Sequence, residues 1–421
     1  MMSSSKVYAT YRVQTPISLE LAAEMIATEQ STGTFVHVPG ETDELRALHR
    51  ATVERVVQTG SATSPALAGS RGAKDETVTE YPEGEVTVSF PYHNMGASIP
   101  NLLAAVAGNL YELSQLSGIR LMDIEVPEEF FDRYKGPKFG ISGTRRLAGV
   151  ESGPIIGTIV KPSIGLSPDN LRALVRELAE SGIDFIKDDE LNANPPYFPF
   201  AEKVRIVMEE IHRAADKAGK QMMYAFNITG DIEEMLTHHD EVLESGGTCV
   251  MVSIHSVGWA ALAYLRERCE LPIHGHRNQW GWMTRHPFLG MEFRAYQKLC
   301  RLAGVDHLHT NGMDNKFYES NESVAKSVRD CLTAFGPGYD VMPVLSSGQW
   351  AASAVKSYQT LGTVDVIHLA GGGIMAHPDG VTAGVESMRQ GWEAALSGQA
   401  LDEYAKTHQE LTRAIAKFGG A

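Results

Sequence analysis

The sequence predicts an α/β protein in which a ferredoxin-like α+β domain over residues 1–132 is followed by a (β/α)8 barrel over residues 133–421, with a helical tail at its end. Two patterns predict this fold. From Gly157 onward, eight short runs rich in β-branched residues each precede a segment of helical length. Before residue 132, the patterns follow the order strand, helix, strand, strand, helix, strand, which is typical of a ferredoxin-like domain.

In the first domain, residues 6–15 alternate in the period of a half-buried strand, and Ser18 is placed to cap the helix that follows. Residues 32–38 predict a second strand, and residues 60–74, rich in Gly, Ser and Ala, predict a loop. The remaining elements are expected over residues 85–92 (strand), 99–116 (helix) and 121–126 (strand), with a linker over residues 133–146.

The eight runs of the second domain begin near Gly157, Ile183, Met222, Cys249, Leu271, His307, Val341 and Val364. Each is followed by a helix-length segment, such as residues 168–180 after the first run. Eight βα units in a domain of this size predict a closed parallel barrel, in which the chemistry lies at the C-terminal ends of the strands. Polar side chains therefore matter most where these runs end.

Composition narrows the class of protein. The formal net charge of −15 disfavours nucleic acid or an anionic membrane as a partner, and no apolar run reaches membrane-spanning length. The first residues lack the apolar core of a signal peptide, so we expect a cytoplasmic protein. The four cysteines, Cys249, Cys269, Cys300 and Cys331, form no Cys-x-x-Cys pair, which argues against a zinc site and a disulfide framework.

The second run ends in one lysine and three carboxylates, Lys187-Asp188-Asp189-Glu190. In a strand, side chains alternate between faces, so Lys187 and Asp189 are expected to point one way and Asp188 the other. A plain ion pair is one explanation for this crowding of charge. The alternative is that the neutral amine of Lys187 captures CO2 as a carbamate. The carbamate, Asp189 and Glu190 would then offer three anionic oxygen ligands, which suit Mg2+.

The stretch Asp-Phe-x-Lys-Asp-Asp-Glu, at residues 184–190, resembles the activation motif of the RuBisCO large-subunit superfamily. The resemblance implies that Lys187 is carbamylated by CO2 and that Asp189 and Glu190 complete a Mg2+ site. It also implies the two-domain fold already expected from the patterns. It extends from about Tyr8 to Gly391.

Other strand ends carry the same resemblance. Lys161-Pro162-Ser163 is similar to the family's Lys-Pro-Lys motif, so Lys161 is expected to act in proton transfer while Ser163 replaces the second lysine. The fifth run ends in His276 and Arg277, which by resemblance are a metal- or substrate-facing histidine and a phosphate clamp. Further positions with implied substrate contacts are His309 near the second phosphate, Lys316 on the mobile loop, and Ser346, Gly348, Gly371 and Gly372 for hydroxyl and phosphate groups.

The resemblance also implies an assembly in which each site is shared. Residues matching Glu29, Thr34 and Asn109 reach into the barrel of a neighbouring subunit in the family, so a homodimer or higher homo-oligomer is expected. Phe35 replaces the family's usual Trp.

The departures at Ser163, Phe35 and Asn315 disfavour net CO2 fixation on ribulose bisphosphate and indicate a RuBisCO-like protein. The segment around His276-Arg277-Asn278 is similar to the apionate-catabolic branch. The resemblance therefore implies decarboxylation of a branched 3-oxo sugar-acid phosphate, of the 3-oxo-isoapionate 4-phosphate type. The alternatives are hydrolytic C–C cleavage of the same substrate type and an enolase or isomerase of a ketose phosphate. A non-catalytic phosphate-binding protein is the alternative from a different class.

Overall fold

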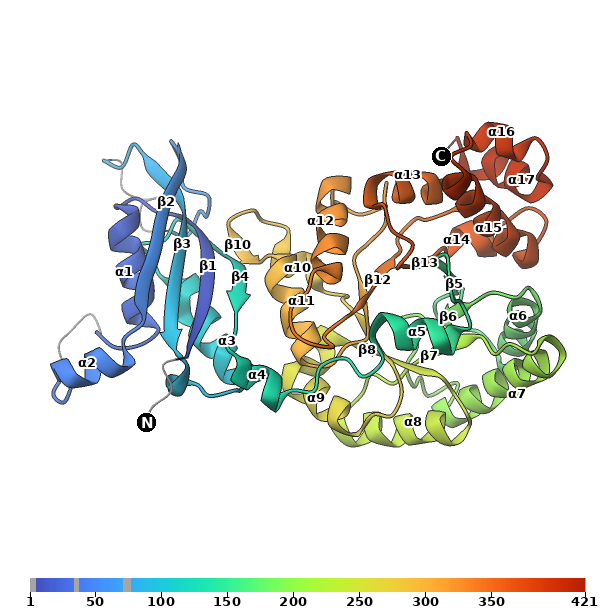
Figure 1. Cartoon of the computed structure of the whole chain (residues 1–421), viewed down its shortest axis with the longest axis horizontal. Coiled ribbons are helices and arrows are strands. Elements are labelled where there is room, and N and C mark those ends of the chain that lie inside the picture. Colours follow the sequence, from blue (N-terminus) through green and yellow to red (C-terminus); the bar gives the residue numbers. More distant parts are fainter. Residues whose placement is uncertain (1–4, 34–37, 71–76, 421) are drawn as a thin grey trace. The chain divides into compact units, whose positions relative to one another are not determined.

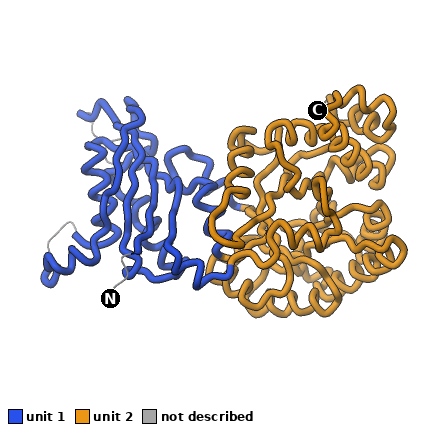
Figure 2. Tube along the Cα trace, in the orientation of Figure 1, with its two compact units in different colours: residues 1–135, 279–302 blue, residues 136–278, 303–421 orange. Residues whose placement is uncertain are grey.

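The structure is a computed structural model that describes residues 5–33, 38–70 and 77–420. The chain forms two compact units (Figures 1 and 2). Unit 1 comprises residues 1–135 and 279–302, and unit 2 comprises residues 136–278 and 303–421. Residues 279–302, from within the range expected for the barrel domain, therefore group with the N-terminal segment. The domain boundary after residue 132 stays a prediction.

Unit 1 is built on a five-stranded sheet in the order β10-β4-β1-β3-β2. The first four strands in the chain give the order β4-β1-β3-β2, and their neighbours pair antiparallel. The short strand β10 is added in parallel to β4 at the edge. Its elements are β1 (Lys6–Gln14), α1 (Leu19–Glu29), α2 (Asp43–His49), β2 (Thr52–Ala62), β3 (Tyr81–Pro91), α3 (Ile99–Ala107), β4 (Gly118–Glu125), α4 (Glu128–Arg133), α10 (Trp280–Thr284), β10 (Leu289–Met291) and α11 (Phe293–Leu302).

The expected order of strands and helices is present in unit 1, apart from an additional helix, α2, and differences at two places. The strand expected over residues 32–38 lies largely outside the described residues, and the second strand is β2, which also takes the first residues of the expected loop. The helix expected to reach residue 116 ends at Ala107, because Gly108 follows it and a short 3-10 turn, Asn109–Glu112, continues the chain. Ser18 caps α1 as expected, since its side chain accepts a hydrogen bond from the N–H of Leu21.

Unit 2 is a closed barrel of eight parallel strands, which confirms the predicted fold class. All eight expected runs contain a strand: β5 (Ile155–Ile159), β6 (Phe185–Lys187), β7 (Met223–Asn227), β8 (Cys249–Ser253), β9 (Ile273–His276), β11 (His307–His309), β12 (Met342–Leu345) and β13 (Ile367–Leu369). The helices around it are α6 (Pro168–Glu180), α7 (Phe200–Ala218), α8 (Ile232–Glu244), α9 (Ile254–Arg268), α12 (Asn321–Leu332), α13 (Ala351–Leu361), α14 (Gly372–Met375) and α15 (Val381–Ser397), followed by α16 (Leu401–Ala405) and α17 (Gln409–Phe418).

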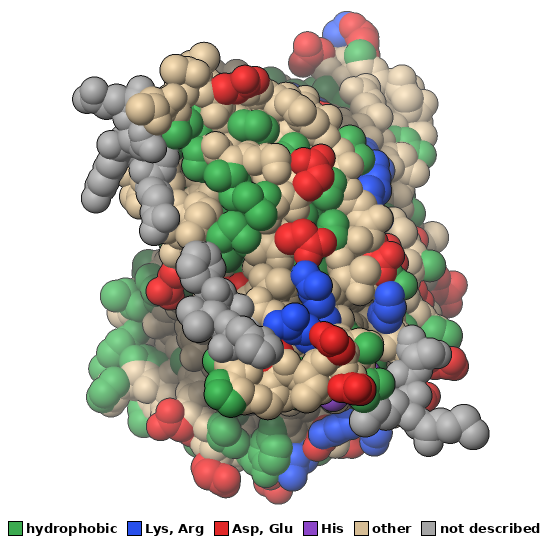
Figure 3. All heavy atoms as spheres, turned by 90° about the vertical axis from the view of Figure 1, so that its left-hand side faces the viewer, with side chains coloured by type: hydrophobic (Ala, Val, Ile, Leu, Met, Phe, Trp, Pro, Cys, Tyr) green, Lys and Arg blue, Asp and Glu red, His purple; other side chains and the backbone are tan. Residues whose placement is uncertain are grey.

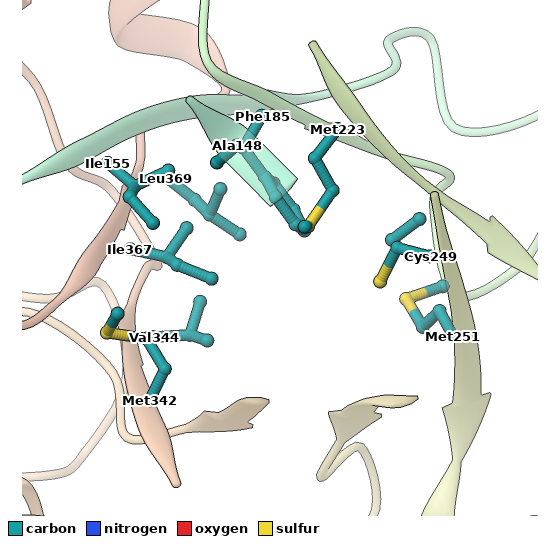
Figure 4. Packing of buried hydrophobic residues seen from close by; sticks show 11 residues of the cluster. Ala148, Ile155, Phe185, Met223, Cys249, Met251, Met342, Val344, Ile367 and Leu369 are labelled. Carbon is teal, nitrogen blue, oxygen red and sulfur yellow. The ribbon is translucent and has the colours of Figure 1, made fainter. Parts of the chain in front are cut away.

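The expected linker over residues 133–146 is partly wrong, because it contains most of helix α5 (Gly140–Ala148). Ala148 packs against the buried side chains at the beginnings of the strands, including Ile155, Phe185 and Met223 (Figure 4). These apolar residues fill the N-terminal half of the barrel. Polar inward-facing side chains are therefore left for the opposite, C-terminal end.

Among the described residues, no helix is both long enough and apolar enough to cross a membrane.

Candidate active site

Alternation along the barrel strands explains which side chains meet at the C-terminal end. Phe185 belongs to the buried barrel core, so Lys187, two residues later, faces the same interior. On β7, Met223 and Ala225 belong to the same core, so Asn227, two residues after Ala225, also faces the interior. The predicted site residues of unit 2 that lie at or after the C-terminal ends of barrel strands are Lys161, Lys187, Asp189, Glu190, His276, Arg277, His309, Lys316, Ser346, Gly348, Gly371 and Gly372.

Lys187 is buried, with an exposed fraction of 1%. Its Nζ donates to the carbonyl oxygen of Asp188 at 2.8 Å and lies 3.4 Å from Oε2 of Glu190. Burial lowers the pKa of this amine, against the opposing charges of Glu190 and Asp189. A lowered pKa increases the share of the neutral amine, which is the nucleophilic form.

Asp189 and Glu190 each face a different basic side chain. Oδ2 of Asp189 accepts a hydrogen bond from Lys161 at 2.6 Å, and Oε2 of Glu190 lies 3.5 Å from Nε2 of His276. Burial alone would raise the pKa of Asp189, but the hydrogen bond from Lys161 lowers it. Burial is likewise outweighed at Glu190, whose pKa is lowered by His276 and Lys187. These two carboxylates and Lys187 are brought together in one place.

Asp188 points away from this group, in keeping with strand alternation. Its carboxylate accepts from Lys203 Nζ at 2.7 Å, from the Tyr224 hydroxyl at 2.7 Å and from the N–H of Asn227 at 2.9 Å. The side chains of Asp188 and Lys203 are each only 1% exposed. This buried ion pair holds the end of β6 on the side opposite Lys187 and Asp189.

Asn227, at the end of β7, was not among the residues that the sequence predicted for the site. Its side-chain amide donates to the carbonyl oxygens of Asp189 at 3.2 Å and Glu190 at 3.3 Å. Its position two residues after an interior alanine, at the end of a strand, is the signal that could have found it. Asn227 therefore holds the backbone that carries the two carboxylates.

Lys161 lies beside Ser163, which stands at the position of the family's second lysine. Its Nζ donates to the hydroxyl of Ser163 at 2.8 Å as well as to Asp189. The Lys161 side chain is 41% exposed, in contrast to 2% for Lys187. Lys161 also lies next to Gly371, since a Cβ added there would be 3.9 Å from its Cε.

Four histidines line the barrel interior beside these charges. Nε2 of His274 lies 2.8 Å from Nε2 of His309, whose Nδ1 lies 3.1 Å from the Ser346 hydroxyl. Burial lowers the pKa of His276 to about 4 and that of His307 to about 3, with Lys187 contributing at His276. Burial also places the pKa of His274 and His309 well below the ordinary value. The imidazoles are therefore neutral at pH 7.

Arg277 does not face an open phosphate site. One of its terminal nitrogens donates to Oε2 of Glu319 at 2.7 Å, and both side chains are 6% exposed. The same oxygen accepts from Nδ2 of Asn311 at 2.6 Å. Glu319 and Asn311 were missed at the sequence level, because no resemblance or spacing pointed to a carboxylate opposite Arg277.

Lys316 is exposed, and its Nζ lies 5.3 Å from the centre of the Phe317 ring. The loop that carries it is anchored on both sides of the lysine. Asp314 accepts from Lys356, and Nδ2 of Asn315 donates to the carbonyl oxygen of Glu319 at 3.0 Å.

The glycines after the last two strands leave room for a ligand. A Cβ added at Gly372 would meet no heavy atom within 4 Å, and Gly371 has only ordinary contacts. Gly348 has a φ of +80°, which glycine adopts without strain, and its Cβ would be 3.4 Å from the backbone nitrogen of Lys316. These positions are suited to close approach by a phosphate group.

The predicted contributors from a neighbouring subunit lie in unit 1. Glu29 is the last residue of α1, and Asn109 begins the 3-10 turn after α3 and is exposed. Thr34 and Phe35 lie outside the described residues. Their roles stay predictions.

Within the described part of the chain, no group of three or more His, Cys, Asp and Glu side chains is arranged to hold a metal ion. The barrel instead brings together two carboxylates and one buried lysine amine.

Comparison with known proteins covers almost the entire chain. Residues 140–418 match the model of the ribulose bisphosphate carboxylase large chain, catalytic domain, and residues 2–130 match that of its N-terminal domain. The chain is 48% identical to the 3-oxo-isoapionate-4-phosphate transcarboxylase/hydrolase of Xanthobacter autotrophicus, over 98% of this chain and 99% of that protein. It is 44% identical to the 3-oxo-isoapionate-4-phosphate decarboxylase of Rhizobium etli, over 97% and 98%.

Solved structures agree with these similarities. A rubisco-like protein from Burkholderia fungorum superposes with a TM-score of 0.91 at 42% identity, over 98% of this chain and all of that one (100%). The dimeric archaeal Rubisco from Hyperthermus butylicus superposes with a TM-score of 0.84 at 31% identity, over 100% and 97%.

Proposed function

This chain belongs to the ribulose bisphosphate carboxylase large-chain family, and we propose that it is an enolate-forming carboxy-lyase that decarboxylates a branched 3-oxo sugar-acid phosphate. The proposed substrate is of the 3-oxo-isoapionate 4-phosphate type, since relatives 44% and 48% identical carry that substrate in their names. The observation that carries the proposal is the meeting of the buried Lys187 amine with Asp189 and Glu190.

The donor set fits Mg2+ once Lys187 has reacted with CO2. The amine adds to the carbon of CO2 and loses one proton, which gives an anionic carbamate. Lys187 as carbamate, Asp189 and Glu190 would then hold the cation through oxygen atoms, as a hard divalent ion prefers. When bound, Mg2+ would supply the positive charge that stabilises an enolate oxygen. Asn227 supports this set by fixing the backbone of both carboxylates.

In the proposed reaction, the bond between the carboxylate carbon and the neighbouring carbon breaks, and its electron pair moves toward the ketone as CO2 leaves. The resulting enolate must then be protonated at carbon. Lys161 is the proposed proton donor, because its amine carries three N–H groups and donates two of them to Asp189 and Ser163. The neutral His276 keeps its proton on Nε2, since Nδ1 accepts from the N–H of Asn278 at 3.3 Å.

The remaining predicted residues bind and enclose the substrate in this proposal. Gly371 and Gly372 offer backbone N–H groups to the phosphate, and Ser346 binds a hydroxyl group. Lys316 reaches the substrate carboxylate when the loop around it closes over the site. The exposed position of Lys316 leaves its charge available for that contact.

Hydrolytic C–C cleavage is the second candidate, and the 48% identical transcarboxylase/hydrolase favours it. Water would add to the ketone, and the bond to the neighbouring carbon would break to give two shorter acids. An enolase or isomerase acting on a ketose phosphate would use the same metal and base. Carboxylation of ribulose bisphosphate is disfavoured by Ser163 at the position of the second lysine.

The deciding experiment supplies carbon-13-labelled 3-oxo-isoapionate 4-phosphate with Mg2+ and bicarbonate, and follows the products by NMR. Decarboxylation releases one labelled CO2 per substrate and leaves a sugar phosphate one carbon shorter. Hydrolysis keeps every labelled carbon in two acids and releases no CO2. If neither product forms from this or related branched acids, the proposed reaction is wrong.

We also propose a cytoplasmic homodimer whose sites are completed by Glu29, Thr34 and Asn109 of the neighbouring subunit. A dimeric relative supports the assembly. Unit 1 has exposed apolar side chains of the kind that interfaces bury: Leu21 is 54% exposed and Leu48 is 48% exposed. Figure 3 shows hydrophobic side chains gathered between charged groups on one face of the molecule.

A further inference from the structure

Arg277, which the family resemblance implies is a phosphate clamp, is paired with a carboxylate of the chain itself. Glu319 lies on the loop between β11 and α12, and its Oε2 accepts from Arg277 at 2.7 Å and from Asn311 at 2.6 Å. Its other oxygen accepts from the hydroxyl of Ser323 at 2.9 Å. The Glu319 carboxylate thus accepts hydrogen bonds from three side chains. A phosphate bound at this place would need the same donors.

The Arg277–Glu319 ion pair is buried, so replacing the Glu319 carboxylate by a substrate phosphate would cost free energy. Arg277 and Glu319 are each 6% exposed. Removing one partner of a buried ion pair leaves an uncompensated charge, so a phosphate could use Arg277 only if Glu319 moved away or if two anions shared one cation. Like charges placed together at a buried site strongly oppose binding.

His309, the residue expected near the second phosphate, is also engaged inside the barrel. Its Nε2 lies 2.8 Å from His274, and its Nδ1 lies 3.1 Å from the hydroxyl of Ser346. Both ring nitrogens therefore have protein partners. The ring has no second N–H with which to meet a phosphate while these contacts last.

The loop carrying Glu319 is held in place by its neighbours. Nδ2 of Asn315 donates to the Glu319 carbonyl oxygen at 3.0 Å. Asn311 adopts a φ of +64°, and its Oδ1 accepts from the hydroxyl of Ser347 at 3.0 Å. The Glu319 carboxylate is thus part of a hydrogen-bond network that links the segments after β11 and β12.

We propose that Glu319 is an internal anion that fills the phosphate position at Arg277 and makes this enzyme selective for substrates with a single phosphate. The inference rests on the proposed function and deepens it, because it excludes sugar bisphosphates and leaves the glycines after β13 as the phosphate site. Glu319 acts through Arg277 and is a specificity-determining residue.

The test measures binding by calorimetry, with ribulose 5-phosphate as the monophosphate probe and ribulose 1,5-bisphosphate as the bisphosphate probe. The wild-type protein should bind the bisphosphate no more than about threefold tighter than the monophosphate. Glu319→Gln should tighten bisphosphate binding about tenfold or more and change monophosphate binding little, because the Arg277 charge is released. The double variant Arg277→Gln with Glu319→Gln should lose that gain.

Glu322→Gln is the matched control, since it removes an exposed carboxylate of the same type three residues away on α12. A wild-type preference for the bisphosphate of tenfold or more would overturn the proposal, and this measurement does not depend on any variant folding. Equal weakening of both probes by Glu319→Gln would overturn it as well. Because binding needs no turnover, these results are independent of whether the branched acid is decarboxylated.

Discussion

The amine of Lys187 lies 3.4 Å from Oε2 of Glu190 inside a barrel whose core beneath them is apolar. An ordinary buried ion pair would require that amine to be charged. Burial instead lowers its pKa, which favours the neutral form that can add CO2. The lowered pKa assists carbamate formation, and the dependence of activity on CO2 decides between the carbamate and a plain ion pair with Glu190.

The first prediction follows from the carbamate. Lys187→Ala should lose activity roughly a hundredfold or more, because the site would keep only two anionic ligands. Wild-type enzyme freed of CO2 or treated with EDTA should lose activity to a similar extent and recover it with bicarbonate and Mg2+. Lys217→Ala, at an amine that is 65% exposed, is the control and should retain activity. Full activity of enzyme without CO2 would contradict the carbamate.

The second prediction concerns the buried pair behind the site. Lys203→Met should destabilise the fold by about 3–5 kcal/mol, because it leaves the carboxylate of Asp188 buried without its cation. The measurement is urea unfolding followed by circular dichroism. The double variant Lys203→Met with Asp188→Leu should recover part of the loss, since neither charge then remains. Equal stability of wild type and Lys203→Met would show that the pair is not structural.

The sequence allowed prediction of the eight barrel strands because most of them begin with apolar residues that the interior requires. It also allowed prediction of the strand ends where charged residues collect, since alternation carries the interior register from Phe185 to Lys187. Helix α5 was missed because residues 140–148 carry two glycines, which disfavour a helix, and lie in a passage rich in Pro and Gly. Its helix is stabilised by tertiary contacts, such as Asp306 accepting from the N–H groups of Phe139 and Gly140.

The partners of site residues were harder to predict than the residues themselves. Arg277 could be found from its motif, but its pairing with Glu319 joins positions 42 residues apart through a loop conformation. Likewise, Asn227 reaches carbonyl oxygens on the neighbouring strand end, 38 residues away in the chain. Local patterns contain no information on such pairings, because they depend on how loops close over the barrel.

The third prediction is a pH dependence at Glu210, a carboxylate on α7. It accepts hydrogen bonds from Arg176, Arg172 and Arg213, and the bond from Arg176 is the largest cause that lowers its pKa to about 2. The folded-state pKa lies below the ordinary value of 4.5, so the stabilisation is present above pH 4.5 and is lost as the pH falls toward 2.

Glu210→Gln should therefore lower the melting temperature at pH 7, and the difference from wild type should shrink as the pH falls below 4.5. Differential scanning calorimetry over this range measures it. Glu209→Gln, at the neighbouring carboxylate that is 46% exposed, should have a much smaller effect. A difference that stays constant with pH would show that Glu210 stabilises the fold by packing alone.

The fourth prediction tests shared sites. Lys187→Ala and Asn109→Ala subunits should each be inactive alone, because each lacks one part of every site. Mixed dimers contain one intact site each, so a random equal mixture should recover about a quarter of wild-type activity. The measurement needs subunit exchange to be verified by native mass spectrometry. Mixed dimers that form and remain inactive would mean that Asn109 does not complete a partner's site.

The fifth prediction separates the carboxylate step from the enolate step at Lys316. Its amine is exposed beside Phe317, on a loop anchored at Asp314 and Asn315, so its cation can reach a substrate carboxylate when the loop closes. Lys316→Met keeps the length and removes the charge. CO2 release should fall by roughly a hundredfold or more, the scale of deleting one electrostatic contact in a site that excludes water.

The same Lys316→Met variant should still exchange solvent deuterium into the decarboxylated product, because that exchange requires only the enolate-stabilising site and Lys161. Lys356→Met, which removes the partner of Asp314 without touching the lysine at the loop tip, is the control for loop anchoring. If exchange and CO2 release fall together in Lys316→Met, the lysine serves general substrate binding. If neither falls, the loop takes no part in the reaction, and the enolase or isomerase alternative gains support, since those reactions involve no substrate carboxylate.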